Sequence, residues 1–486
     1  MLDTRRYLSQ LIDEAYRLSQ KYVFISFSMS FLLAFSLAFI PTYALERDGV
    51  YTMFILLFAA GLWTTEAIPA FAVSLLIIAL EIVLLGFPNL DFATPSDNWK
   101  VYLQPWSSPL IFLFLAGFIM AAAASKTKLD LWLAKTILFY MGSKPHNIIT
   151  GLIGITFVLS MFISNTATAA MMMTILIPMS RNVNESNPFK KSIFLAVVVG
   201  ANLGGMATII GTPPNAIAVG ILGEEAPSFI AWMVMALPPA LAVTLILRLV
   251  ILKLYPSNEP FIDIQMIKEV ERSDNSTKDF SKIPTVPSWK QYVTMIIFTL
   301  TVLMWLSGPL HHIPTTVVSL IPIIGFTLFG IIDADDIATI RWDVIILIIG
   351  GLSLGLAVSK TGLDLWFATL ISTDGLSILL VMFIFSYLIV IISNFMSNTA
   401  AANIMLPIVI AIAITISEHS TQMVVVGVAL SASFAMSLVV STPPNAIVYA
   451  SNKVDSKDFL ILGAITALIG PVTVITWLYC VDSIFS

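Results

Sequence analysis

The sequence predicts an all-α polytopic membrane protein with inverted repeats, about 11 transmembrane helices and two re-entrant hairpins. The first observation is composition: of 486 residues, 58% are hydrophobic and 11% charged, with a mean hydropathy of +0.94, whereas soluble domains are roughly a quarter charged. The second is a series of apolar segments of about 20 residues, the length that spans a bilayer as a helix. The third is a set of short polar motifs that each occur twice.

Eleven apolar segments are candidates for transmembrane helices. They cover residues 22–42, 50–64, 67–88, 107–124, 190–222, 228–254, 290–307, 314–332, 343–358, 421–450 and 457–482. Residues 1–21 contain three Arg and one Lys without a cleavage-site pattern, so we expect a cytoplasmic N-terminal lead before a first transmembrane helix in 22–48. Residues 255–288 form the one long polar stretch and are predicted to be a cytoplasmic linker.

Two further apolar segments do not fit a simple crossing. Residues 147–179 and 377–416 are each too long for one span, and the first is too short for two. Each is interrupted near its middle by a Ser-Asn-Thr string, at 164–166 and 397–399, which we name the tip motifs. Basic residues flank both ends of the first segment, which places both ends on one side of the membrane. We therefore predict a re-entrant hairpin with a tip motif at each turn.

Three motifs recur in the same order. The elbow motifs lie at 125–132 and 359–366, followed in each case by a tip motif. The break motifs, Thr-Pro-Pro-Asn, come next, at 212–215 and 442–445. The distance along the chain between the two members of each pair is nearly constant, which indicates a duplicated unit. The two predicted copies are residues 49–254, the first copy, and residues 289–486, the second copy.

The distribution of basic residues predicts that the copies are inverted. Seven basic residues surround the first hairpin, and only Lys360 is found at the matching positions of the second. The seven are Lys126, Lys128, Lys135, Lys144, Arg181, Lys190 and Lys191. Because basic residues favour the cytoplasmic side, we expect a cytoplasmic N-terminus, an extracytoplasmic C-terminus, and hairpins that enter from opposite faces of the cell (inner) membrane.

The repeated motifs predict a binding site at mid-membrane. A Pro-Pro pair unwinds a helix, because proline lacks an N–H and excludes the α conformation from the residue before it. Gly200, Gly204 and Gly205 are expected to add flexibility just before the first break. A helix that begins at a tip motif directs its positive end and free N–H groups at the tip, which suits an anion. Inverted repeats with broken helices are an architecture of secondary transporters.

Fixed charge is missing from this predicted site. No Lys, Arg, His, Asp or Glu lies between Gly151 and Ser180 or between Leu376 and Ser417. A dianion among neutral groups is unstable, and each helix end contributes only about half a charge. We therefore expect bound cations such as Na⁺ to supply the remaining positive charge.

The tip motifs, the break motifs and the string Trp63-Thr-Thr-Glu-Ala-Ile-Pro69 closely resemble the divalent-anion:sodium symporter family, the INDY-type di- and tricarboxylate transporters. The resemblance covers essentially the whole chain. It implies a homodimer formed through a scaffold domain that includes the first helix, and a transport domain that moves like an elevator. It also implies sodium-coupled uptake of dicarboxylates such as succinate, malate and fumarate.

The resemblance also implies which residues bind. The substrate carboxylates would contact Ser164, Asn165, Thr166, Ser397, Asn398 and Thr399, with Thr212 and Thr442 as pocket walls. The first sodium site would use Ser160, Ser164, Asn165 and the Gly211 backbone, and the second Ser393, the Met396 carbonyl, Asn398 and the Ser441 backbone. Sodium ions would be co-transported, and no other cofactor is expected.

Other functions remain open at this point. One is a dicarboxylate exchanger of the same fold, and another is sodium-coupled transport of citrate or sulfate. An intramembrane enzyme is not expected, because the hairpins lack a nucleophile–base pair and metal ligands. No basic tract points to nucleic acid. Outside the hairpins, Asp130 and Asp364 are expected to cap the helices after the elbow motifs, Glu66 to cap a turn, and Glu81 to lie near a membrane face or to be paired.

Overall fold

The computed structural model describes the chain as helices joined by short loops, and no strand occurs among the described residues. These are residues 21–40, 45–87, 90–93, 96–181, 183–262, 288–370, 377–417 and 420–485. Nine helices within these ranges are long and apolar enough to cross a membrane. The predicted N-terminal lead and most of the 255–288 linker lie outside the described residues.

The first copy follows an initial helix, Lys21–Ala38. Its helices are α2 (Arg47–Thr65), α3 (Ala70–Leu85), the 3-10 helix η2 (Asn98–Ser107), α4 (Pro109–Lys126), α5 (Leu129–Met141), α6 (Pro145–Ser160), α7 (Asn165–Ser180), α8 (Phe189–Gly205), α9 (Pro213–Leu222), η3 (Gly223–Glu225) and α10 (Phe229–Leu254).

The second copy repeats this order of long and broken helices. Its helices are α12 (Trp289–Leu306), α13 (Gly308–His311), α14 (Thr315–Val318), α15 (Leu320–Leu328), α16 (Ala334–Ala338), α17 (Trp342–Lys360), α18 (Leu363–Leu370), α19 (Ile378–Phe395), α20 (Asn398–Ile416), α21 (Thr421–Ser431), η5 (Ala432–Phe434), α22 (Pro443–Tyr449) and α23 (Ser456–Phe485).

Helices overlap all eleven predicted crossings, but several are short. The segment predicted at 314–332 is Thr315–Leu328, below the length of a full crossing. The segments predicted at 190–222 and 421–450 are each two half-helices. The two predicted hairpins are α6–α7 and α19–α20, each a helix pair that meets at a tip motif. The count of 11 crossings and the re-entry of the hairpins stay predictions.

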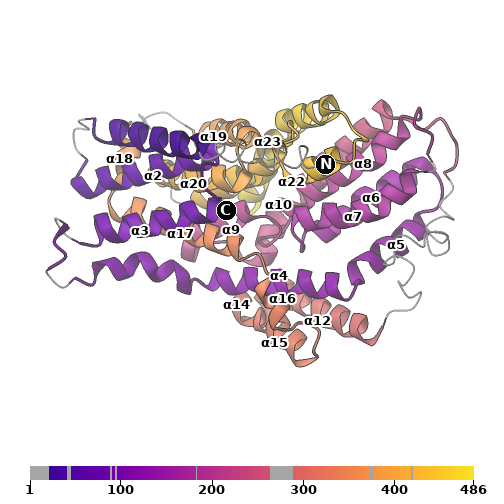
Figure 1. Cartoon of the computed structure of the whole chain (residues 1–486), viewed down its shortest axis with the longest axis horizontal. Coiled ribbons are helices and arrows are strands. Elements are labelled where there is room, and N and C mark those ends of the chain that lie inside the picture. The colour runs from indigo at the N-terminus through magenta and orange to yellow at the C-terminus, as the bar shows by residue number, and fades with distance from the viewer. Residues whose placement is uncertain are drawn as a thin grey trace, which may run out of the picture.

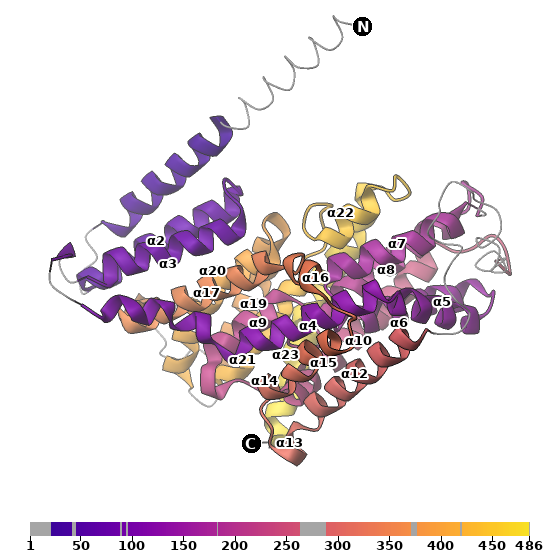
Figure 2. The ribbon, with the colours of Figure 1, turned by 60° about the horizontal axis from the view of Figure 1, so that its bottom comes forward.

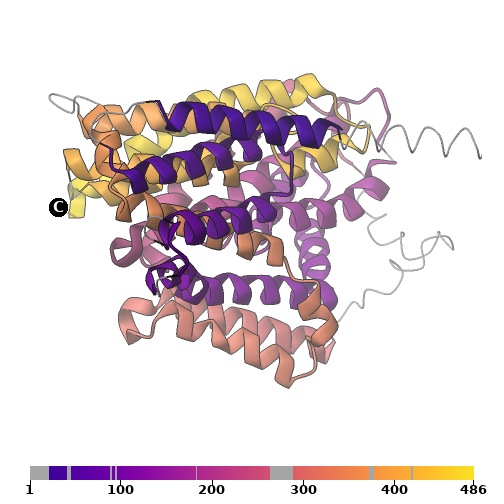
Figure 3. The same cartoon turned by 60° about the vertical axis from the view of Figure 1, so that its left-hand side comes forward.

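Two large hydrophobic clusters hold most of the buried apolar side chains, and a third consists only of Ile78, Ile345 and Ile349. The smaller of the two large clusters joins the Lys21–Ala38 helix, α2, α3, η2 and the face of α17 that carries Leu354, and it reaches α18 and the start of α20 through Leu363 and Ala400. The larger one joins α4, the first hairpin, most of the second hairpin, the broken helices, α10 and α23. Figure 1 shows α2 and α3 at the left end and α5 to α8 at the right end. In Figure 2, α4 crosses between these ends, and α12 and α15 pack beside it. Figure 3 shows the indigo and purple helices one above another, with the salmon α12–α15 region below them.

The break motifs start the second half-helix in each copy. Thr212 (φ −149°, ψ 145°) and Thr442 (φ −140°, ψ 147°) are extended, as expected of residues that precede proline. Pro213 and Pro443 then occupy the first helical position, where a missing N–H leaves no hydrogen bond unmade. The predicted unwinding is therefore present in both copies.

The glycines before the first break pack closely against other segments instead of loosening the chain. Gly200, Gly204 and Gly205 all lie within α8. A Cβ on Gly204 would lie 2.3 Å from the Phe157 carbonyl oxygen of α6. Glycine at this position allows α6 and α8 to approach each other, so the prediction of added flexibility was wrong.

The elbow motifs form the same turn twice. Lys128 (φ 59°) and Gly362 (φ 68°), at matched positions in the two copies, both adopt the left-handed conformation between a long helix and a short one. The carboxylates of Asp130 and Asp364 each accept the N–H of the next residue at 2.7 Å. Each aspartate thus satisfies one free N–H in the first turn of α5 or α18, as the predicted capping role requires, although the N-cap residue of α5 itself is Lys128.

Candidate functional site

Each tip motif caps the helix that follows it. The Ser164 hydroxyl accepts the Ala167 N–H at 3.3 Å, and the Ser397 hydroxyl accepts the Ala400 N–H at 3.2 Å. Serine is favoured at this position, because its oxygen satisfies an N–H that the helix leaves unpaired. Thr166 and Thr399 follow in the first turns of α7 and α20. Both tips therefore present a helix N-terminus with its partial positive charge.

The structure brings together the residues expected at the first sodium site. Ser160 is fully buried, and its hydroxyl lies 2.8 Å from Asn165 Oδ1 and 2.7 Å from the Ala201 carbonyl oxygen. A Cβ on Gly205 would lie 2.2 Å from Asn165 Oδ1, so the amide rests on this glycine. A Cβ on Gly211 would lie 2.3 Å from the Gly205 carbonyl oxygen. Oxygens of this kind are the ligands that a hard cation takes.

The corresponding residues of the second copy are more open to a ligand. Ser393 is fully buried, and neither its Oγ nor Asn398 Oδ1 has a hydrogen-bond partner among the described residues. The equivalent atoms of Ser160 and Asn165 bond each other. Met396 is extended (φ −135°, ψ 174°), which takes its carbonyl out of the α-helical ladder. Unpartnered buried oxygens are unusual in folded proteins, and a bound ion or water is one way to satisfy them.

Asn394 belongs to this region and was not predicted from the sequence. Ser441, expected near the second sodium site, has its hydroxyl 3.1 Å from both the carbonyl oxygen and the Oδ1 of Asn394. The same Oδ1 accepts the Ser437 N–H at 2.9 Å. Asn394 thus ties the second hairpin to the unwound segment before α22. Comparison of the two copies could not identify Asn394, because the corresponding residue of the first copy is Met161.

The asparagine of each break motif holds the unwound segment that precedes it. Asn215 Nδ2 lies within 3.3 Å of three carbonyl oxygens, and Asn445 Nδ2 lies within 2.9 Å of two. The carbonyls belong to Gly205, Met206 and Thr208 in the first copy, and to Met436 and Leu438 in the second. Met206 matches Met436 in the repeat, and Thr208 matches Leu438, so the hydrogen bonds follow the repeat. Carbonyls freed at the breaks are thereby satisfied.

The two copies interlock at the breaks. The buried Asn202 of α8 donates from Nδ2 to Asn445 Oδ1 of α22 at 3.2 Å. Helix α7 of the first hairpin packs against α22, and α20 of the second hairpin packs against α9. Thr212 and Thr442 are both buried, and the Thr442 hydroxyl donates to Asn445 Oδ1 at 2.8 Å. Each tip motif therefore starts a helix that contacts the broken helix of the other copy.

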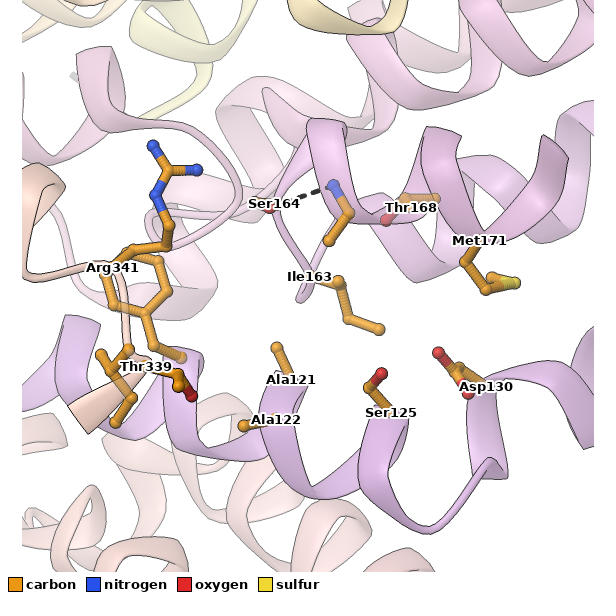
Figure 4. Close-up of a pocket in the computed structure, with 13 residues that line it drawn as sticks. Ala121, Ala122, Ser125, Asp130, Ile163, Ser164, Thr168, Met171, Thr339 and Arg341 are labelled. Carbon is orange, nitrogen blue, oxygen red and sulfur yellow. Dashed lines mark hydrogen bonds between the residues drawn. The ribbon is translucent and has the colours of Figure 1, made fainter. Parts of the chain in front are cut away.

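A cavity of about 200 Å³ lies beside the first tip. Figure 4 shows Ser125 and Asp130 on one wall, Ser164 and Thr168 on the opposite wall, and Arg341 at one end. Burial raises the pKa of Asp130 to about 6. Nearby, the Lys126 ammonium binds Asp333 and Asp336 and lowers the pKa of Asp333 to about 2. No residue of the second tip lines this cavity in the described part of the chain.

The two glutamates singled out in the sequence, Glu66 and Glu81, lie at a helix end and in a buried helix contact. Glu66 ends α2 in the left-handed conformation (φ 49°), in agreement with the expected capping role. Glu81 is fully buried and accepts a hydrogen bond from Ser353 of α17, whose hydroxyl also lies 3.1 Å from the Tyr102 carbonyl oxygen. The other carboxylate oxygen, Oε1, has no hydrogen-bond partner among the described residues, so Glu81 is paired through one oxygen only, with a neutral hydroxyl.

Asn445→Leu is expected to lower the thermal unfolding midpoint of the purified protein strongly. The substitution leaves two carbonyls without the Asn445 amide, and each unsatisfied buried group costs about 1–3 kcal/mol. Asn202 loses its bond to Asn445 and keeps the one to the Val198 carbonyl oxygen. The measurement is thermal unfolding in detergent. Asn98→Leu is the control, because Asn98 is exposed in η2 and its replacement should leave the midpoint nearly unchanged. Equal midpoints for the two variants would contradict the role given to Asn445.

Comparison with known proteins assigns the chain to a family. The sequence profile of the citrate transporter family CitMHS matches residues 60–424. Sodium-dependent dicarboxylate transporters SdcS from two strains of Staphylococcus aureus are each 30% identical over 490 residues, which cover 93% of this chain and 89% of theirs.

Two solved structures share the fold. The YdaH transporter of Alcanivorax borkumensis has a TM-score of 0.53 at 12% identity and covers 84% of this chain and 98% of its own. MtrF of Neisseria gonorrhoeae has a TM-score of 0.55 at 12% identity, and the match covers 86% of this chain and 96% of MtrF. At this identity the likeness concerns the fold alone. The profile match and the near full-length identity to the SdcS proteins show that the chain belongs to the divalent-anion:sodium symporter family of multi-pass membrane transporters.

Proposed function

We propose that the protein is a secondary active transporter that couples Na⁺ to the uptake of four-carbon dicarboxylates such as succinate, malate and fumarate. The observation that carries the proposal is the pair of tip motifs, each a helix N-terminus without a charged side chain in its hairpin. The SdcS relatives, described as sodium-dependent dicarboxylate transporters, support the choice of both cargoes.

A charge balance explains why sodium is required. Two helix N-termini together offer about one positive charge to a dianion. About one negative charge then remains uncompensated in a site of low polarity, where isolated charge is strongly disfavoured. The site therefore needs at least one bound Na⁺, and the two copies offer one oxygen-rich set each.

The predicted substrate and sodium residues keep their roles in this proposal. Tip residues contact the carboxylates, with Thr212 and Thr442 beside them. The unpartnered oxygens of Ser393 and Asn398 support a cation site in the second copy. In the first copy, the Ser160–Asn165 hydrogen bond would open to admit the ion.

The movement we propose is of the elevator type. The larger hydrophobic cluster contains the first hairpin, most of the second hairpin and both broken helices. The smaller one contains the first helix, α2 and α3, and Ala400 at the start of α20 packs into it. The elbow turns at Lys128 and Gly362 join long helices to α5 and α18 and would allow the hairpins to move relative to the rest. A homodimer through the smaller part, a cytoplasmic N-terminus and location in the cell membrane complete the proposal.

The anion and the mode of transport are tested by competition and counterflow in proteoliposomes. Radiolabelled succinate uptake driven by a sodium gradient should fall about tenfold with excess unlabelled malate or fumarate, and less with citrate or sulfate. Stronger competition by citrate or sulfate would show that the protein transports one of those anions in preference to four-carbon dicarboxylates. Counterflow that is fast without sodium would instead establish the dicarboxylate exchanger.

A further inference from the structure

The cavity beside the first tip gathers several side chains with oxygens, of which only Ser164 belongs to the predicted substrate and sodium sites. It is lined by the C-terminal half of α4 and the elbow before α5, by the start and first two turns of α7, and by the chain just before α17. Figure 4 shows the Ser125 hydroxyl and the Asp130 carboxylate directed toward the space below α7, with Ser164 and Thr168 on the facing wall.

Two of these groups are buried without the partners that their chemistry requires. Asp130 is only 5% exposed and forms no ion pair with any described residue; its Oδ1 accepts the Leu131 N–H at 2.7 Å. Thr168 is 0% exposed, and its Oγ1 has no hydrogen-bond partner among the described residues. Buried carboxylates are normally paired with a cation. Both residues line the same cavity, and we infer that one cation bound between them satisfies the two groups together.

The charges around the cavity favour a cation over an anion. Arg341, at its far end, bonds Asp343 through Nε and Nη2 at 2.9 and 2.8 Å, so its charge is balanced. Lys126 is directed to Asp333 and Asp336 of the α16 region. The Asp130 carboxylate is then the charge left uncompensated on the wall. A single carboxylate with neutral oxygens suits a monovalent hard cation better than Ca²⁺ or Mg²⁺, which take more oxygen ligands or several waters.

The second copy does not repeat this arrangement. Asp364 matches Asp130 and makes the same bond to the next N–H, but it is half-exposed. The residue that matches Thr168 is Ala401, which has no side-chain oxygen. An aspartate that only caps the short helix needs neither the burial of Asp130 nor a threonine at position 168. The difference between the copies therefore points to a ligand in the first one.

We propose that this cavity binds Na⁺ through the Asp130 carboxylate and the hydroxyls of Thr168, Ser125 and Ser164. It shares Ser164 with the first predicted sodium site, but the other members of that site, Ser160, Asn165 and Gly211, do not line this cavity. The inference rests on the proposed sodium coupling. Its role is to hold an ion next to the first tip, between the binding site and the face at which the first hairpin is predicted to enter.

Equilibrium binding of radioactive sodium to the purified, substrate-free protein tests the proposal. Asp130→Asn should lose one bound Na⁺ per protomer, or bind it at least tenfold more weakly, because an amide lacks the charge. Thr168→Val should weaken the same site about threefold or more. Asp364→Asn, which alters the matched residue of the second copy, should bind sodium like the wild type.

The outcomes separate this inference from the proposed function. Unchanged sodium stoichiometry and affinity in Asp130→Asn would overturn the inference, as would a wild type that binds no sodium. If Asp130→Asn does not elute as a folded protein in size-exclusion chromatography, Thr168→Val decides in the same way. Sodium-independent succinate uptake by the wild type would overturn the proposed function, whereas the binding comparison among variants would still decide the inference.

Discussion

Asn165→Ala and Asn398→Ala are each expected to abolish measurable succinate uptake. Each asparagine is the first residue of a helix at a tip, and its side chain is proposed to contact both a carboxylate and a sodium ion. Hydrogen bonds to charged groups contribute about 1.5–3 kcal/mol each. Two lost contacts of that strength correspond to a decrease of roughly 100-fold or more.

The measurement is the initial rate of radiolabelled succinate uptake into proteoliposomes at equal protein content. Asn147→Ala is the matched control, because Asn147 lies in the same hairpin but bonds the Met141 carbonyl oxygen at 3.0 Å, away from the tip. The control should transport within about threefold of the wild type. Near-normal uptake by both tip variants would mean that the site has been assigned to the wrong residues.

The breaks and the repeat could be predicted because they depend on local chemistry. Proline excludes the α conformation from the preceding threonine wherever it stands, and Thr212 and Thr442 are extended as a result. The tip serines cap helices through the N–H of a residue in the first turn, which is again a local effect. The long apolar segments predicted the helices in the same way.

The features that could not be predicted depend on contacts between distant segments. Asn394 matters because Ser437 and Ser441, which follow much later in the chain, fold back onto it. The break asparagines matter because their amides reach freed carbonyls, whereas the sequence drew attention to the neighbouring threonines. The tight contact of Gly204 with Phe157 likewise exists only once α6 and α8 are packed.

The capping role of Asp130 shows how a correct prediction can be incomplete. The aspartate does bond the next N–H, as its partner Asp364 does. Its burial beside Thr168 follows from the packing of α5 and α7 around one cavity, which neither sequence segment specifies. Local pattern therefore identified the cap, and only the assembled structure showed the cavity.

Removal of sodium is expected to have an effect as large as loss of a tip asparagine. No charged side chain lies in either hairpin between Gly151 and Ser180 or between Leu376 and Ser417, so the protein itself supplies only the helix ends and neutral oxygens. Protons could substitute for sodium only by protonating the dicarboxylate, and at neutral pH the dianion predominates. We therefore expect succinate uptake to fall at least about 100-fold, which corresponds to roughly 2.7 kcal/mol of lost binding.

The central claim is that neutral tips hold a dianion only together with sodium. It is tested most directly by succinate uptake into proteoliposomes with sodium replaced by choline on both sides and the pH held equal across the membrane. Our account predicts uptake at the level of protein-free liposomes, restored by an inward sodium gradient. Uptake at the full rate without sodium would contradict it.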